Sequence, residues 1–168
     1  YKIRFGIETG SDRVAEKMTL GKKHDLKKLK TMVEFGKSIG MLFYGTISVG
    51  GLGSDKNEDQ KTVDLVYDLA AKGWLDEIQV SINTPQPGTD FYYSCAEESL
   101  IPPSIDWDAF DGNGHVVVNY PHYPAEEIQA SFKNALKAFD LGKGKAKAKT
   151  FSENTNASSI PAGSRILI

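Results

Sequence analysis

The sequence predicts an α/β fold in which a parallel sheet grows from successive strand–helix–strand units. Short β-rich segments alternate with longer amphipathic segments, and the connections between them are short and rich in glycine. The length of 168 residues is too small for a complete (β/α)8 barrel, which takes about 250 residues. We therefore expect a parallel βαβαβ unit, followed by C-terminal helices and an irregular tail.

The first strand is expected over residues 3–8, where apolar and polar residues alternate loosely, as in a buried parallel strand. A turn follows, and in it Ser11 or Asp12 can cap a short helix. This helix is expected to run to Met18, with Gly21 as its stop.

The next four elements follow from hydrophobic spacing and β propensity. Apolar residues at three- and four-residue intervals predict helices, and short runs of β-branched and aromatic residues predict strands. The expected elements are a helix over 25–39, a strand over 41–49, a helix over 58–72 and a strand over 77–83.

The last third of the chain is predicted to be less regular. Thr89 is expected to cap a helix that runs to Glu98, and residues 107–122 suggest an irregular connection or a short β excursion. A final helix starts at Pro124 and is expected to end before Gly142. We thus divide the chain into a folded unit over residues 1–141 and a lysine-rich linker and tail over 142–168.

Composition excludes several classes of function. The 20 Lys and Arg against 22 Asp and Glu give a net charge of −2, which is no basis for a broad electrostatic grip on nucleic acid. The sequence holds no apolar run of membrane-spanning length and starts with no signal-peptide pattern, so we expect a cytoplasmic protein without membrane or nucleic-acid partners. The lone Cys95 cannot form an intramolecular disulfide or supply an iron–sulfur cluster, and the three histidines lack ligand spacing. No metal site is predicted in this chain.

Chemistry is expected at the carboxyl ends of the strands, where parallel α/β sheets bind ligands. Glu8 ends the first strand and can accept hydrogen bonds from ribose hydroxyls, although a surface or helix-capping carboxylate is an equally good interpretation. The glycines over 50–53 can admit a flat ligand or simply form a tight turn. The residues alone leave both alternatives open.

Five segments, in this order and spacing, resemble the radical S-adenosylmethionine enzymes. "FGIETGSDRVAEKM" is similar to their fourth-strand segment, "ISVGGLGSDKNED" to the fifth, and "DEIQVSINTPQPGTDFY" to the sixth with its Thr-Pro-x-Pro-Gly-Thr exit. "DWDAFDG" and "YPAEEI" resemble the connection and final helix of the cobalamin-binding branch. The resemblance covers about residues 1–141 and implies the C-terminal half of a partial TIM barrel.

The resemblance also implies a cofactor pocket for S-adenosylmethionine. Glu8 would bind the ribose hydroxyls, and the implied pocket residues are Glu8, Thr9, Ser11, Ile47, Gly51, Leu52, Asn83 and Thr84. None of them is expected to act as a catalytic acid or base. The chain departs from the family in carrying Leu20 where a cation is common, and Gly53 and Ser54 where Pro and Gly are usual.

The CxxxCxxC cluster loop and the first three strands of the family barrel are absent from this sequence. We therefore expect a fragment of a radical oxidoreductase or methyltransferase that is inactive alone, with the 4Fe-4S cluster, and any cobalamin, belonging to the parent enzyme only. The alternative is a non-catalytic α/β module that binds a nucleotide or a partner chain.

A half barrel is expected to leave unpaired strand edges and an apolar interior open to water. We expect these surfaces to be covered by self-association, by the missing N-terminal half of the barrel, or by the C-terminal residues 165–168.

Overall fold

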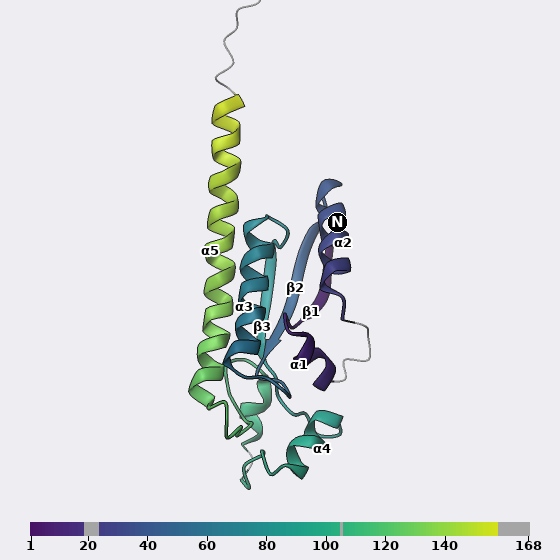
Figure 1. The fold of residues 1–168 in the computed structure, drawn as a ribbon, viewed down its shortest axis with the longest axis vertical. Helices are drawn as coiled ribbons and strands as arrows, with labels where there is room; N and C mark the ends of the chain where they lie inside the picture. Colours follow the sequence, from purple (N-terminus) through teal and green to yellow (C-terminus); the bar gives the residue numbers. More distant parts are fainter. Residues whose placement is uncertain (19–23, 105, 158–168) are drawn as a thin grey trace, which may run out of the picture.

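The computed structural model describes residues 1–18, 24–104 and 106–157, and it confirms the α/β fold. Three parallel strands form one sheet in the order β1 (Lys2–Glu8), β2 (Leu42–Val49) and β3 (Glu77–Ile82) (Figure 1). Each strand lies within two residues of its predicted bounds. Short β-rich segments between the amphipathic helices therefore located the sheet correctly.

Three long helices pack on one face of the sheet. They are α2 (Leu26–Ser38), α3 (Lys56–Ala71) and α5 (Ala125–Ala157), and their apolar sides share a core with the inward residues of the strands (Figure 1). The shorter elements are α1 (Asp12–Lys17), α4 (Asp90–Glu97) and the 3₁₀ helix η1 (Trp107–Asp111). None of the described helices combines the length and the apolar character that crossing a bilayer requires.

Side-chain caps fix where the helices begin. Ser11 Oγ accepts from the Val14 N–H at the start of α1, and Thr89 Oγ1 accepts from the Tyr92 N–H at the start of α4, as predicted. The helix expected from residue 58 begins two residues earlier, because Asp55 caps α3 through the N–H groups of Asn57 and Glu58. The predicted stop at Gly21 lies outside the described residues.

A second apolar cluster closes the end of the sheet where the strands terminate. It joins the last residues of β2 and β3 to α4 and the start of α5, and its buried members are Val49, Ile82, Cys95, Leu100, Val118, Tyr120, Tyr123 and Ile128. The segment over 107–122 that joins them contains η1 and one isolated bridge between Tyr120 and Tyr123, in line with the predicted irregular connection.

The predicted end of the last helix before Gly142 is wrong. α5 continues through the lysine-rich segment to Ala157 and extends well past the sheet (Figure 1). A Cβ built on Gly142 would lie 2.7 Å from Ala70 Cβ and 2.9 Å from the Ala71 nitrogen. This glycine therefore serves the close crossing of α5 over α3, whereas the sequence suggested a terminator. The unit boundary at residue 141 stays a prediction, and residues 158–168 lie outside the described part.

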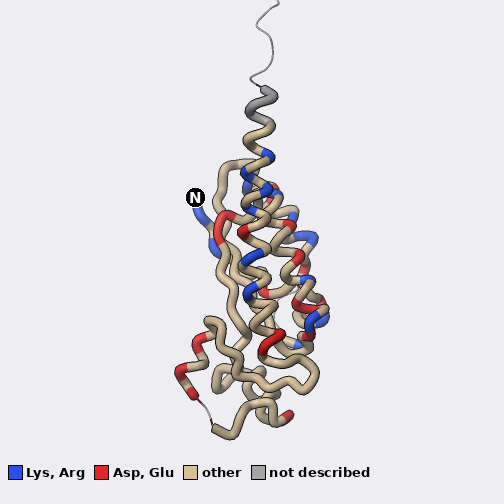
Figure 2. The backbone as a smooth tube through the Cα atoms, turned by 90° about the vertical axis from the view of Figure 1, so that its left-hand side faces the viewer, with Lys and Arg blue, Asp and Glu red and all other residues tan. Residues whose placement is uncertain are grey.

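The expectation of an apolar interior open to water is also wrong. The face of the sheet that the described helices leave uncovered carries polar side chains: Arg4 Nη2 donates to Gln79 Oε1 at 2.6 Å, and the guanidinium lies 5.0 Å from the Tyr44 ring centroid. Lys2 and Glu77 form an ion pair at 2.6 Å on the same sheet. Strand alternation explains this face, because successive side chains point to opposite sides and the apolar ones meet the helices. Charges of both signs are interspersed over the helical side (Figure 2).

Candidate functional site

The carboxyl ends of the three strands lie side by side at the same end of the sheet, which we call the sheet edge below. Glu8 is in register with Ile47, Val49 is in register with Ile82, and the Asn83 N–H donates to the Val49 carbonyl at 2.8 Å. Because all three strands run parallel, the turns that follow them open toward the same side. The geometry thus brings together the segments in which the sequence predicts a ligand site.

Glu8 ends β1 in an unusual backbone conformation. Its φ is 68°, and the register between β1 and β2 shifts between Gly6 and Glu8. A left-handed conformation costs a non-glycine residue about 1 kcal/mol or more, and such strain concentrates at functional sites. The Ser48 hydroxyl donates to the Glu8 carbonyl at 3.4 Å. Glu8 is the strongest candidate for a ligand contact in this turn.

Thr9 and Ser11 are buried and hydrogen-bonded within the protein. Thr9 Oγ1 lies 3.1 Å from Thr62 Oγ1 and accepts from the Ser11 N–H at 3.1 Å. Ser11 Oγ donates to Glu58 Oε2 and caps α1. These hydroxyls fix the β1–α1 turn, so a contact of either side chain with a ligand stays a prediction.

The predicted residues on β2 divide into two groups. The Ile47 side chain is 1% exposed and lies in the helix-covered core, so only its backbone lies near the sheet edge. Gly51 and Leu52 lie in the turn itself, beside Met18 at the end of α1: the Leu52 N–H lies 3.1 Å from Met18 Sδ. A Cβ built on Gly51 would lie 2.8 Å from Asn83 Nδ2, so the Asn83 side-chain amide lies directly beside the Gly51 backbone.

Thr84 follows Asn83 at the end of β3 and lies next to the η1 segment. Its hydroxyl donates to the Ile82 carbonyl at 3.2 Å, and it lies beside Gly112, whose carbonyl accepts from the Ile82 N–H at 2.9 Å. The η1 segment therefore borders β3 at this end. Asn83 and Thr84 are both half-buried and line the third side of the edge.

Asp59 organises the β2 turn, and the sequence analysis missed it. Its carboxylate accepts from the Gly50 N–H, the Ser54 hydroxyl and the Tyr123 hydroxyl, each at 2.9 Å. Burial raises the pKa of this carboxyl, although the three hydrogen bonds act in the opposite direction. The sequence does contain a signal that Asp59 is buried. Its spacing from Thr62, Val63 and Val66, at three, four and seven residues, places it on the apolar face of α3.

His24 ties down the start of the same edge. Its Nε2 lies 2.8 Å from the Thr9 carbonyl oxygen and its Nδ1 lies 3.1 Å from Asp12 Oδ1. Both ring nitrogens are thus engaged in the β1–α1 turn. No cluster of three or more potential metal ligands occurs within residues 1–18, 24–104 and 106–157.

Cys95, the single cysteine of the sequence, does not suit an iron–sulfur cluster. It is fully buried in the second apolar cluster, and burial raises its pKa to about 12. Clusters are held by several thiolates. The residues of this chain therefore do not fit a cluster.

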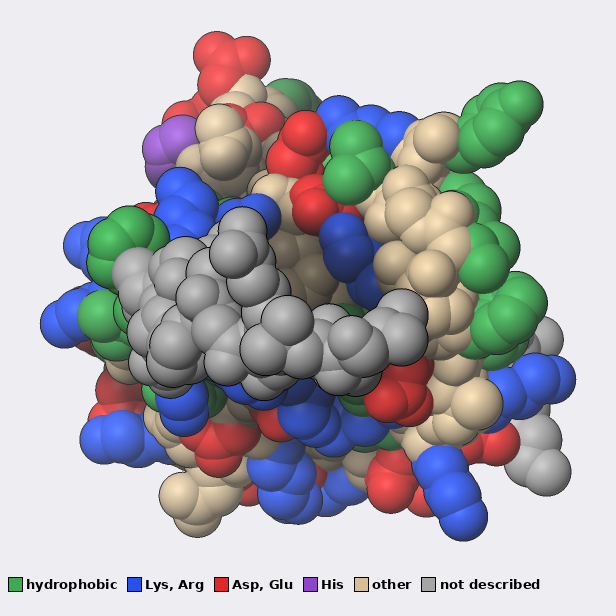
Figure 3. All heavy atoms as spheres, turned by 90° about the horizontal axis from the view of Figure 1, so that it is seen from above, with side chains coloured by type: hydrophobic (Ala, Val, Ile, Leu, Met, Phe, Trp, Pro, Cys, Tyr) green, Lys and Arg blue, Asp and Glu red, His purple; other side chains and the backbone are tan. Residues whose placement is uncertain are grey.

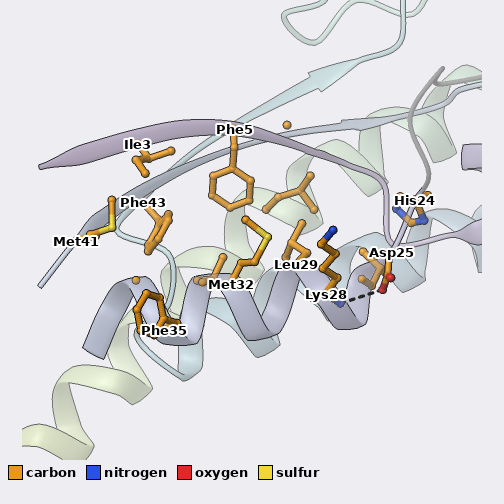
Figure 4. Close-up of a pocket in the computed structure, with 15 residues that line it drawn as sticks. Ile3, Phe5, His24, Asp25, Lys28, Leu29, Met32, Phe35, Met41 and Phe43 are labelled. Carbon is orange, nitrogen blue, oxygen red and sulfur yellow. Dashed lines mark hydrogen bonds between the residues drawn. The ribbon is translucent and has the colours of Figure 1, made fainter. Parts of the chain in front are cut away.

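A pocket of about 450 Å³ lies away from the strand ends, between β1 and α2 (Figure 4). Ile3, Phe5 and Phe43 point from the strands toward the helix, and Leu29 and Met32 extend from α2 toward the strands (Figure 4). The lining is largely apolar, which does not suit the ribose or the amino acid group of S-adenosylmethionine. We call it the β1–α2 groove.

Comparison with known proteins gives one informative similarity. No protein-family model matches the chain. The sequence is 26% identical over 142 residues to a protein of Pyrococcus horikoshii described as an uncharacterized methyltransferase. The match covers 84% of this chain and 29% of that protein, so the chain spans less than a third of the length of this relative. The chain is thus similar to part of a larger methyltransferase.

Proposed function

We propose that this chain supplies one wall of the S-adenosylmethionine pocket in a radical-type methyltransferase or oxidoreductase. The observation that carries the proposal is the meeting of three parallel strand ends, at Glu8, Gly51 and Asn83, on one edge of the sheet. The similarity to a methyltransferase supports a cofactor that carries a methyl group. The radical chemistry rests on the family resemblance of the five sequence segments.

The groups at this edge suit an adenosyl ligand. A carboxylate such as Glu8 matches the two hydroxyls of a ribose, and the strain in its backbone supports a functional role. The backbone at Gly51 and Leu52, with the Asn83 amide, can form hydrogen bonds to the edge of a purine. When bound, S-adenosylmethionine would supply a methyl or adenosyl group, and these residues would bind and orient it.

The proposal assigns the rest of the chemistry to a longer parent protein. The single Cys95 is buried and cannot supply the several thiolates that hold an iron–sulfur cluster. The 4Fe-4S cluster, and cobalamin if the parent uses it, would be held by other segments. The chain by itself is expected to bind the cofactor without turnover.

Calorimetry with S-adenosylmethionine tests the pocket. We expect the wild-type chain to bind, and Glu8→Ala to weaken binding by about tenfold or more, because a hydrogen bond to a charged group is worth roughly 1.5–3 kcal/mol. Glu97→Ala, which removes an exposed carboxylate on α4, is the matched control and should bind like the wild type.

Three outcomes count against the proposal: no binding by a folded chain, equal binding by Glu8→Ala, or a preference for ATP over S-adenosylmethionine. The last result would favour the alternative of a non-catalytic nucleotide-binding module. Formation of a chain-bound cluster on anaerobic treatment with iron and sulfide would contradict the assignment of the cluster to the parent.

A further inference from the structure

Asp59 is a buried charged residue directly behind the sheet edge. Lysine, arginine and acidic side chains lie side by side on the surface at the opposite end of the molecule, where the strands begin (Figure 3). Those side chains face water, whereas Asp59 is 1% exposed. A carboxylate is rarely buried unless several groups bind it, so the contacts of Asp59 indicate what it holds in place.

The Asp59 carboxylate holds both ends of the turn that follows β2. Its Oδ2 accepts from the Gly50 N–H and its Oδ1 accepts from the Ser54 hydroxyl, each at 2.9 Å. The Ser54 N–H also donates to the Gly51 carbonyl at 3.0 Å, which closes the turn. Residues 51–53 lie between the two anchored positions. One carboxylate thus determines where the backbone of these three residues lies.

Two tyrosines of the second apolar cluster support this arrangement. The Tyr123 hydroxyl donates to Asp59 Oδ2 at 2.9 Å, and the Tyr120 hydroxyl donates to the Gly50 carbonyl at 3.4 Å. Both tyrosine side chains are buried. The turn is therefore supported by close-packed residues, and its backbone has little freedom to shift.

The anchored turn presents a hydrogen-bond donor at the sheet edge. The Leu52 N–H lies 3.1 Å from Met18 Sδ, and a thioether is only a weak acceptor. Leu52 is half-buried, and the unbranched side chain of Met18 can adopt other rotamers. A ring nitrogen of a ligand is a stronger acceptor and can take the place of the thioether. The Leu52 N–H can thus distinguish a ring nitrogen with a lone pair from one that carries a hydrogen.

We propose that Asp59 and Ser54 are positioning residues for a purine, and that they hold the Leu52 N–H so that it donates to N1 of an adenine. The inference rests on the proposed function, because it concerns the same cofactor pocket. N1 of adenine carries a lone pair, whereas N1 of hypoxanthine carries a hydrogen and would meet the Leu52 N–H donor to donor. A fixed turn should therefore prefer adenosyl over inosyl ligands, whereas a loose turn can shift to accept either base.

Calorimetry of the full chain with S-adenosylhomocysteine and S-inosylhomocysteine tests this base preference. We expect the wild type to bind the adenosyl ligand about tenfold or more tightly than the inosyl ligand, and Ser54→Ala to reduce the preference to about threefold or less, because one end of the turn is released. Ser131→Ala is the matched control. It also removes a buried hydroxyl, 7% exposed and 2.8 Å from the Tyr123 hydroxyl, but it leaves all three hydrogen bonds of Asp59 in place. Its preference should equal that of the wild type.

Asp59→Asn and Asp59→Ala form a second pair. The amide keeps an acceptor for the Gly50 N–H and can donate to Ser54, so Asp59→Asn should retain the preference and Asp59→Ala should lose it. The ratio of the two affinities is the readout, because a variant that is only partly unfolded binds both ligands less tightly by the same factor. Circular dichroism reports whether each variant is folded, and if Asp59→Ala does not fold, Ser54→Ala decides alone.

Two results overturn the positioning role while leaving the proposed function intact. One is a wild type that binds both ligands equally well, and the other is a folded Ser54→Ala that keeps the full preference. A folded wild type that binds neither ligand contradicts the proposed function itself, and the positioning role is then also wrong.

Discussion

Single residues at the strand ends combine candidate ligand groups with local backbone strain. Glu8 combines a carboxylate with a φ of 68° at the point where β1 leaves the sheet. Ile7 is the last residue of β1 in the core, so the left-handed conformation lies just past the packed part of the strand. The backbone conformation turns the chain toward α1 while leaving the carboxylate at the edge.

The strain at Glu8 predicts an unusual order of stability between two variants. Both Glu8→Ala and Glu8→Gly remove the carboxylate, but only glycine adopts a positive φ without cost. We expect Glu8→Gly to have a free energy of unfolding about 1 kcal/mol higher than Glu8→Ala, measured in urea. Within α1, Glu16→Gly should instead be less stable than Glu16→Ala by roughly 1 kcal/mol, because that site is helical. If the glycine variant is less stable than the alanine variant at both positions, the backbone of Glu8 is not strained.

Residue-level prediction from sequence succeeded where the interaction is local. Ser11 and Thr89 bond to N–H groups three residues ahead, so their capping role can be inferred from short segments. Asp59 bonds to Tyr123, 64 residues away, and no local pattern specifies that partner. Thr9 appeared free for a ligand because its partner, Thr62, also lies on a distant element.

At the scale of elements, glycine has two roles that the sequence does not distinguish. Gly40 and Gly73 have φ of 81° and 70° and lie just after α2 and α3, as a helix-terminating glycine does. Gly142 lies inside α5, where it allows contact with α3. The prediction of a terminator at Gly142 failed because the contact depends on how two helices cross.

Two alanine substitutions in α5 should have opposite effects. Gly142→Ala forces a Cβ within 2.9 Å of α3 backbone atoms and should destabilise the protein by roughly 1–3 kcal/mol. Gly144→Ala, two residues further, meets nothing within 4 Å and should stabilise α5 by up to about 1 kcal/mol through helix propensity. Thermal unfolding of both variants checks this, and equal shifts for the two would mean that α5 does not cross α3 closely at Gly142.

For the whole molecule, the sequence analysis predicts the parallel sheet correctly but not the polar character of its uncovered face. Alternation of short β-rich and longer amphipathic segments is enough to indicate a βαβαβ order. The segment of β2 was interpreted as an almost uninterrupted β-rich run, although Tyr44, Thr46 and Ser48 alternate with the buried Phe43, Ile47 and Val49. That alternation already specified one polar face, and counting it would have avoided the expectation of an apolar interior.

The buried Asp59 carboxyl should impose a pH dependence on global stability. Because burial raises its pKa above the ordinary value of 3.8, its contribution to stability is fully present below about pH 3.8 and is lost as the pH rises through the folded-state pKa. Asp59→Asn does not titrate, and its amide can still bond to Ser54. The free energy of unfolding of the wild type relative to Asp59→Asn should therefore fall with rising pH in urea titrations. A difference that is constant or rises would contradict the raised pKa.

The Asp59 carboxylate also connects the turn after β2 to the start of α5 through hydrogen bonds. One oxygen accepts from both the Gly50 turn and Tyr123, and Tyr123 lies 2.8 Å from Ser131 in α5. Any displacement of the turn must carry Tyr123 with it or break these bonds. The turn after β2 is thereby connected, through a single carboxylate oxygen and one tyrosine hydroxyl, to the first turns of a 33-residue helix.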